Sequence, residues 1–248
     1  MKHIMLSDIH GNLEALTAVL EDCGPGQLYV LGDIIGYGAD PGKCVKRIRQ
    51  SEAIVIRGNH EQVQLDWNEL KHFNPLARES AEYTRTRLSP ADHDWLSQLP
   101  YEWSDDAIYL SHGSPYGAQR FYYLMPGDVR SPYLTLSLSK LERLGLGLAF
   151  HGHTHIPGYF FIKDGRPVFL SLAEDTVVKL DSKARYLINC GSVGQPRNHN
   201  PKAQYLIYDD ETFTLEKRSV AYDAALAAEK IRSAGLPSPL WERILQGI

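Results

Sequence analysis

The chain has 248 residues, of which 43% are hydrophobic and 23% charged, and its formal net charge is −4 at pH 7. This composition is typical of a globular protein, and the acidic balance argues against a protein that coats large nucleic acids by bulk charge. No apolar run reaches the roughly 18 residues that a bilayer requires, and the three cysteines have no C-x-x-C spacing. We therefore expect a cytoplasmic protein without membrane contact, disulfide framework or zinc clip.

Five short apolar runs recur along the chain, and each is followed by a polar loop that contains glycine. Runs this short and this rich in valine and isoleucine are typical of strands buried on both faces of a sheet. They cover residues 3–6, 28–31, 53–56, 107–110 and 146–150. Helical patterns over 12–22 and 41–50 separate the first three, which predicts parallel strands joined by right-handed crossovers.

The remainder of the chain predicts helices first and strands later. Helices are expected over 75–87, from an N-cap at Ser89 with Pro90 at the first helical position, and over 131–144. Strands are expected over 159–162, 167–170, 176–180, 185–190, 203–208 and 213–219, and final helices over 221–234 and 240–246. The pattern predicts one α/β domain over 1–248, a two-sheet β-sandwich flanked by helices. Short helical cap elements are expected at about 62–100 and 114–145.

Side chains that bind metals or protons follow the carboxyl ends of the predicted strands. They are Asp8, His10, Asp33, Asn59, His60, His112, His153 and His155. Each one alone has an ordinary explanation as a turn, cap or surface residue. Together they lie at the sheet edge where α/β proteins bind ligands, which favours a metal site. Nitrogen and oxygen donors without thiolate suit manganese, iron, zinc, nickel or cobalt.

Five motifs carry a family resemblance. They are D-x-H (8–10), G-D (32–33), G-N-H-E (58–61), S-H-G (111–113) and G-H-T-H (152–155). In this order and spacing they resemble calcineurin-like metallophosphoesterases, and above all the compact single-domain prokaryotic members of phosphodiesterase type. The resemblance extends from Lys2 to about Arg197 and includes the glycine-serine loop at 189–198.

The resemblance implies a centre of two divalent transition-metal ions, with manganese as the first choice. It implies the ligands Asp8, His10 and His155 for one ion, and Asn59, His112 and His153 for the other, with Asp33 bridging both. Two such ions about 3.5–4 Å apart lower the pKa of a shared water molecule, and the resulting hydroxide attacks the phosphorus. His60 would protonate the leaving oxygen, and Asp33 and Asn59 count among the catalytic residues. His151 lies outside the motif pattern, and we expect it one step deeper as a hydrogen-bonding partner.

The substrate is expected to be a small phosphate ester, either a phosphodiester or a nucleotide. Arg57 and Arg197 are candidate phosphate ligands, although Arg57 could instead pair with Glu61. Tyr37 and Tyr116 are further candidate substrate contacts. The aromatic loop at 114–127 either stacks on a nucleobase or covers the sheet edge.

Other functions remain open at this stage. The second motif ends in Ile34 and Ile35 and lacks the arginine of related protein phosphatases, which counts against a phosphoprotein substrate. The alternatives are a phosphomonoesterase or protein phosphatase on the same centre, and a metal-dependent protein-binding scaffold without activity. The complete set of ligand residues argues against the scaffold. The oligomeric state is left open.

Overall fold

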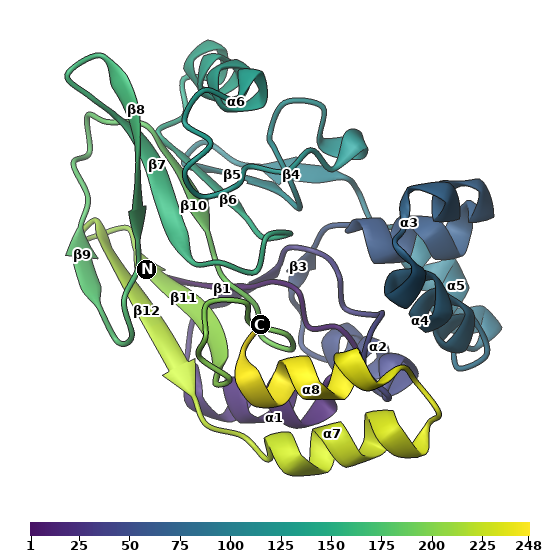
Figure 1. The fold of residues 1–248 in the computed structure, drawn as a ribbon. Coiled ribbons are helices and arrows are strands. Elements are labelled where there is room, and N and C mark those ends of the chain that lie inside the picture. Colours follow the sequence, from purple (N-terminus) through teal and green to yellow (C-terminus); the bar gives the residue numbers. More distant parts are fainter.

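Two mixed sheets of six strands each form the centre of the computed structural model, which describes residues 1–248 (Figure 1). The first sheet has the order β3 (Ile54–Val55), β2 (Gln27–Val30), β1 (Lys2–Leu6), β11 (Ala203–Asp209), β12 (Thr214–Val220) and β9 (Val177–Lys179). The second has the order β4 (Glu102–Ser104), β5 (Ile108–Ser111), β6 (Leu148–His151), β10 (Tyr186–Asn189), β7 (Gly158–Lys163) and β8 (Arg166–Ser171). The predicted two-sheet architecture is confirmed.

Each sheet contains a set of three parallel strands. In the first sheet β1 pairs in parallel with β2, and β2 with β3. In the second sheet β6 pairs in parallel with both β5 and β10. This confirms the parallel crossovers that the alternation of strands and helices predicted. The loops after these strands carry the candidate site.

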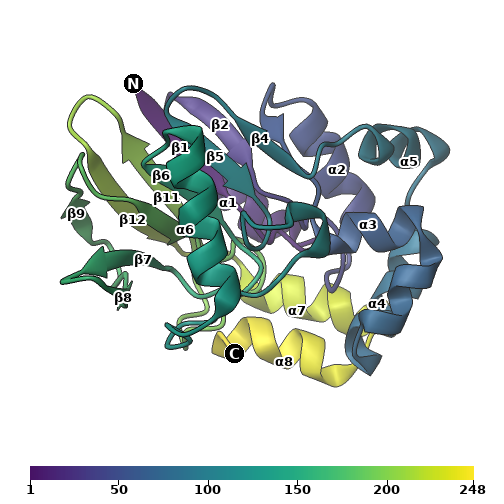
Figure 2. The ribbon, with the colours of Figure 1, turned by 90° about the horizontal axis from the view of Figure 1, so that it is seen from above.

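Helices cover both outer faces of the sandwich (Figures 1 and 2). The helices against the first sheet are α1 (Leu13–Asp22) and α2 (Pro41–Arg49), and α7 (Ala224–Ser233) and α8 (Ser238–Gln246) pack beyond them. The helix against the second sheet is α6 (Pro132–Leu144). A separate helical group lies at one end: α3 (Asn59–Leu65), η1 (Trp67–His72), α4 (Pro75–Arg85) and α5 (Pro90–Ser97). One short turn, η2 (Ala118–Arg120), precedes α6.

Alternation along the strands creates separate cores on the two faces of each sheet. In β1, Ile4 and Leu6 face the core beneath α1 and α2, whereas Met5 faces the core between the sheets. In β6, Phe150 faces the core between the sheets and Ala149 faces α6. Strands buried on both faces explain why their sequences are continuous apolar runs.

Most predicted elements agree with the structure, and their ends differ by a few residues. The helix expected after Ser89 is confirmed, because Ser89 Oγ accepts the N–H of Asp92 at 3.2 Å. The helix predicted from 221 begins only at Ala224, where Asp223 caps it. The loop predicted at Asn59 is instead the first turn of α3, and β4 was not predicted.

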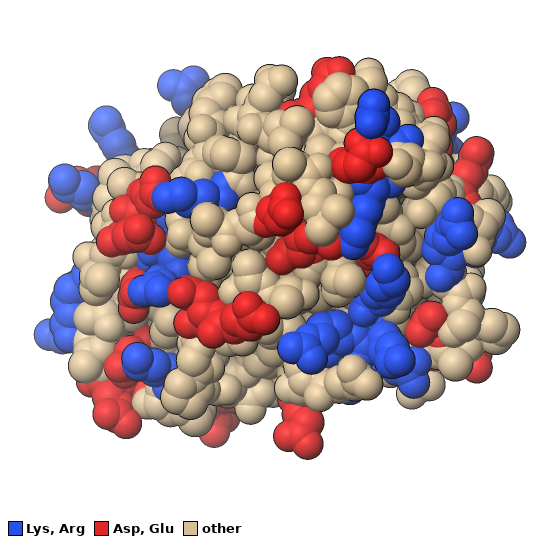
Figure 3. Space-filling view, turned by 90° about the horizontal axis from the view of Figure 1, so that it is seen from below, with Lys and Arg blue, Asp and Glu red and all other residues tan.

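The surface carries charges of both signs. On the underside of the molecule, acidic and basic side chains are interspersed, with one larger gathering of basic groups (Figure 3). No helix combines the length and the apolar character needed to span a membrane.

Candidate metal centre

The loops after β1, β2, β3, β5 and β6 bring the predicted metal-binding side chains together. Their donor atoms form three groups, and within each group the atoms lie within 4.8 Å of one another. We call Asp8, His10 and His155 the first group and Asp33, His112 and His153 the second group; His10, Asp33 and His60 form a third. All of these side chains are buried.

The first group has ring nitrogens that face one another. His10 Nε2 lies 3.1 Å from His155 Nε2, which lies 3.2 Å from Asp8 Oδ1. On the far side of each ring, Nδ1 donates to a carbonyl oxygen, that of Ile35 at 3.1 Å or Gln195 at 2.6 Å. Because a carbonyl only accepts hydrogen bonds, both Nε2 atoms present lone pairs to the group. A cation between these atoms would satisfy all of them.

The second group repeats this arrangement around His112. His112 Nε2 lies 3.2 Å from Asp33 Oδ2, and 3.1 Å from both His153 Nδ1 and Asn59 Oδ1. Its Nδ1 contacts the carbonyl oxygen of Leu31 at 2.7 Å, which fixes the orientation of the ring. Carboxylate, imidazole and amide oxygen are suitable donors for a transition-metal ion.

Asp33 lies between the two groups. Its Oδ2 is 3.7 Å from His10 Nε2 and 3.2 Å from His112 Nε2. Its Oδ1 accepts the backbone N–H of His60 at 2.9 Å. A carboxylate in this position can contact cations in both groups.

The protonation states fit a metal site. Burial lowers the pKa of three imidazoles, which are therefore neutral: His10, His153 and His155. Burial opposes ionisation of Asp8 and Asp33, but adjacent imidazoles outweigh it and hold the pKa of both carboxyls below the ordinary value. Burial also disfavours charge on His112, yet Asp33 and Asp8 raise its pKa to about 10. Without a metal these carboxylates hold a proton on His112, and a divalent cation would displace it.

A buried carboxylate oxygen without a hydrogen-bond partner also supports a metal site. Asp8 Oδ1 is buried and has no hydrogen-bond partner. A buried carboxylate oxygen without a partner is costly. A cation in the first group would remove this cost, so the residues present fit a metal ion.

Most of the predicted ligands have an unusual backbone conformation. Five have φ between 50° and 68°, in the left-handed region: Asp8, His10, Asp33, His153 and His155. Such strain persists only where the surroundings fix it, and it gathers at functional sites. Here the loops fix one another: the Asp8 N–H donates to Gly32 O at 3.2 Å, and the His153 N–H to Asp8 Oδ2 at 3.0 Å.

Glu61 is a positioning residue that the sequence analysis did not identify. Its Oε2 accepts the backbone N–H groups of Asp33 and Gly58, each at 2.8 Å. Its Oε1 accepts those of Ile34 at 2.8 Å and Ile35 at 3.3 Å. Burial and Asp33 raise the pKa of Glu61 to about 7, and the N–H donors oppose that rise. Glu61 thus ties the loop of Asp33 to the start of α3, and its only sequence signal is the last letter of G-N-H-E.

At pH 8, where Glu61 is ionised, we expect Glu61→Gln to lower the free energy of unfolding of the metal-free protein by about 2–4 kcal/mol. The substitution preserves volume, but the new amide group turns an N–H donor toward two backbone N–H donors. Urea unfolding followed by circular dichroism measures the change. Glu79→Gln, on an exposed face of α4, is the control. Equal stabilities of the two variants would contradict the role of Glu61.

His60 stands beside the metal-binding groups. Its ring packs on His10, Tyr37 and Phe73, with centroids 4.6–4.9 Å apart. Its Nδ1 is buried without a hydrogen-bond partner, and burial lowers its pKa to about 4, so the ring is neutral. Gly36 has a φ of 89°, and a Cβ there would come within 2.1 Å of His60 Nδ1. Only glycine at position 36 leaves room for the ring.

Arg57 is not among the residues that line the cavity beside the metal-binding groups. Its guanidinium donates to Gln62 Oε1 at 3.0 Å, Tyr101 OH at 3.3 Å and Ser97 O at 2.7 Å. The alternative expectation, an ion pair with Glu61, is wrong, because backbone N–H groups occupy that carboxylate. Gln62, the next residue along α3, binds the Arg57 guanidinium instead of Glu61. Arg57 therefore connects α3 to the end of α5.

The other predicted substrate residues differ in whether they line the cavity. Tyr37 lines a cavity beside the metal-binding groups. Arg197 lies 5.9 Å from the centre of the Tyr37 ring and donates to Gln195 Oε1 at 2.7 Å, while its Nε is buried without a partner. Tyr116 does not line the cavity; its ring lies 6.5 Å from those of Tyr122 and Tyr133.

His151 ends β6 and lies below the ligand loop. Its Nδ1 is 3.2 Å from Asn189 Nδ2 and 3.3 Å from Gly152 O. The Asn189 amide also donates to Gly152 O at 2.6 Å and to Thr154 Oγ1 at 2.9 Å. The polar groups next to the His151 ring therefore belong to Asn189 and Gly152, and neither is a predicted metal ligand.

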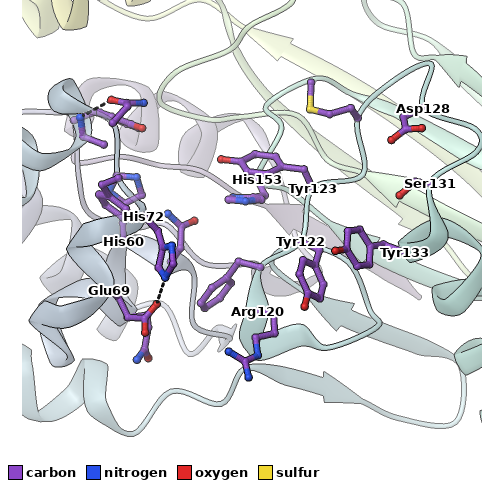
Figure 4. Close-up of a pocket in the computed structure, with 18 of the residues that line it drawn as sticks. His60, Glu69, His72, Arg120, Tyr122, Tyr123, Asp128, Ser131, Tyr133 and His153 are labelled. Atoms are coloured by element: carbon purple, nitrogen blue, oxygen red, sulfur yellow. Dashed lines mark hydrogen bonds and ion pairs between the residues drawn. The ribbon is translucent and has the colours of Figure 1, made fainter.

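A cavity of about 540 Å³ opens beside the second group (Figure 4). Three of the residues that line it belong to the centre: Asn59, His60 and His153. In Figure 4, His60, Glu69 and His72 lie on one side, and Tyr122, Tyr123 and Tyr133 lie on the other. A substrate in this space would contact both sides and the metal-binding residues.

Known proteins resemble this chain over most of its length. The sequence model of the calcineurin-like phosphoesterases matches residues 1–157. An uncharacterised protein of Methanocaldococcus jannaschii is 35% identical over 98% of this chain and 97% of its own. A metallophosphoesterase of Sphaerobacter thermophilus, known from a crystal structure, is 30% identical, with a TM-score of 0.84 over 100% of both chains. The phosphodiesterase YfcE of Escherichia coli is 24% identical over 87% of this chain and 91% of its own.

Proposed function

The chain belongs to the calcineurin-like phosphoesterase family, whose members hydrolyse phosphate esters, and we propose that it hydrolyses a small phosphodiester or nucleotide at a centre of two metal ions. The observation that carries this proposal is the pair of donor groups on either side of Asp33, whose Oδ2 lies 3.7 Å from His10 Nε2 and 3.2 Å from His112 Nε2. Asp8, His10 and His155 would hold one ion, and Asn59, His112 and His153 the other. Manganese suits this set of nitrogen and oxygen donors.

The bound cations would supply Lewis acidity, which polarises a phosphate ester and lowers the pKa of a water molecule. His60, which lines the cavity, is neutral before a substrate binds. An anionic phosphate beside it would favour the protonated ring, which can then pass its proton to the leaving oxygen. Asn59 is uncharged and therefore leaves the site positive, and Arg197 adds a further positive charge. Together these charges favour an anionic substrate.

The phosphodiester is preferred over the monoester for two reasons. The phosphodiesterase YfcE resembles this chain over most of its length. The cavity lies beside the centre and has a volume of about 540 Å³, so there is room for an ester group beyond the phosphate. A protein phosphatase on the same centre is the alternative.

We expect the manganese-loaded protein to hydrolyse bis-p-nitrophenyl phosphate with a kcat/KM at least about tenfold above that for p-nitrophenyl phosphate. Both esters release the same coloured product, so one absorbance assay compares them. Protein stripped of metal with EDTA is the control and should be inactive on both. Hydrolysis of the monoester alone would rule out the diester proposal. A protein that binds manganese but cleaves neither ester would support the scaffold alternative.

A further inference from the structure

The cavity has a flat aromatic side. The rings of Tyr122 and Tyr133 are stacked, with centroids 3.9 Å apart and planes 6° apart. Tyr123 is stacked on His153, with centroids 3.8 Å apart and planes 22° apart. Tyr123 is 52% exposed and Met125 44% exposed, although both are large apolar side chains. A group of exposed apolar side chains that line a cavity is typical of a binding surface.

The backbone holds these rings in a fixed position. Phe121 has a φ of 51°, which is rare for a bulky residue. The carbonyl oxygen of Tyr122 accepts the N–H of Ser114 at 2.8 Å, and a Cβ at Gly113 would come within 2.8 Å of that oxygen. This hydrogen bond and this close contact therefore hold the segment after η2 against the end of β5, close to His112. Rings that are already fixed lose little entropy when a ligand binds.

The cavity also has polar groups on both of its sides. On the opposite side, His72 Nε2 lies 3.8 Å from Glu69 Oε2, and Asn74 also lines the cavity. Asp128 and Ser131 lie near the stacked tyrosines (Figure 4). A hydrocarbon group would leave such donors and acceptors without partners. An aromatic ring with polar edges would instead stack and form hydrogen bonds.

We propose that the wall formed by Tyr122, Tyr123 and Tyr133 binds the base of a nucleotide whose phosphate lies at the metal centre. This inference rests on the proposed function and narrows its substrate to esters of nucleosides. The volume of about 540 Å³ falls in the range of pockets that hold small organic ligands. In Figure 4, the stacked His153 and Tyr123 lie between His60 and the stacked pair of Tyr122 and Tyr133, which matches a ligand with a phosphate at one end and a ring at the other.

The test compares AMP with ribose 5-phosphate, which share the phosphate and the sugar and differ in the base. Isothermal titration calorimetry on the manganese-loaded protein measures both affinities. We expect AMP to bind at least about tenfold more tightly, as base stacking on aromatic side chains predicts. In Tyr122→Leu or Tyr133→Leu this ratio should fall toward one, with the affinity for ribose 5-phosphate unchanged. Tyr122→Phe keeps the ring and should keep the ratio.

Phe169→Leu is the matched control, because this partly buried ring lies on β8, outside the cavity, and packs on Phe160. It should retain the full ratio. Equal binding of AMP and ribose 5-phosphate to the unmodified protein would overturn the subsite, even if the diester is hydrolysed. A ratio that persists in both leucine variants would also overturn it. A protein that prefers AMP but cleaves no ester would retain the subsite and lose the proposed function.

Discussion

Replacing His60 by alanine will lower kcat on the diester by about 10²- to 10⁴-fold and will leave the metal content unchanged. The ring lines the cavity, and its Nδ1 has no partner within the protein. The proposed role is proton donation to the leaving oxygen, which a methyl group cannot perform. The link between His60 and the centre is its backbone N–H, which donates to Asp33 Oδ1 and persists in the variant.

The metal content decides between two roles for His60. Its donor atom lies within 4.8 Å of those of His10 and Asp33, so a direct metal ligand is the competing interpretation. Mass spectrometry of the metals bound after manganese loading and gel filtration separates the two. His93→Ala, on α5 and outside the cavity, is the control and should retain both activity and metal. Loss of metal in His60→Ala would make this residue a ligand.

The sequence predicted the fold because local patterns and topology agree. Apolar runs such as 28–31 and 146–150 are too short for helices, and the helices between the early runs leave parallel pairing as the simplest solution. The positions of the donor residues follow from this topology. Once the strands are parallel, residues after β1 and β2 meet at one edge of the first sheet, and residues after β5 and β6 meet at one edge of the second. The packing of the two sheets then brings these two edges together.

The interactions that fix the donors could not be predicted in the same way. Glu61 and Gln62 are adjacent, and only their position on α3 decides that Glu61 binds backbone N–H groups while Gln62 binds Arg57. The left-handed conformation of Asp8 depends on hydrogen bonds to distant loops. Such choices are made by tertiary contacts between segments, and a single sequence contains no periodic signal for them.

In the aromatic loop 114–127, the sequence likewise did not predict which tyrosine faces the cavity. From the sequence, Tyr116 is the expected substrate contact of this loop, yet Tyr122 lines the cavity and Tyr116 does not. The difference arises from η2 and from the left-handed conformation at Phe121, which together set the direction of the following residues. A turn of this kind depends on the packing of Gly113 against the same segment.

Asp33→Asn is expected to weaken binding in both donor groups, by at least about 100-fold in manganese affinity. Asp33 Oδ2 lies near a ring nitrogen of each group, at 3.7 Å from His10 and 3.2 Å from His112. An asparagine can keep its Oδ1 bonded to the His60 N–H, and it would then turn an N–H₂ donor toward these nitrogens. That donor satisfies their lone pairs and occupies the space of a cation. Calorimetric titration with manganese measures the affinity and the number of ions bound.

Asp8→Asn is the informative contrast to Asp33→Asn. Asp8 belongs only to the group with His10 and His155. Its replacement should therefore weaken the binding of one ion and leave the binding of the other unchanged. Asp22→Asn, which removes a surface partner of Arg218, controls for the loss of an aspartate and should bind manganese normally. The metal-free Asp33→Asn protein should remain folded, because the amide forms hydrogen bonds where the carboxylate required a counter-charge. Full loading of Asp33→Asn with two ions would mean that the groups are filled independently, and Asp33 would then not be shared.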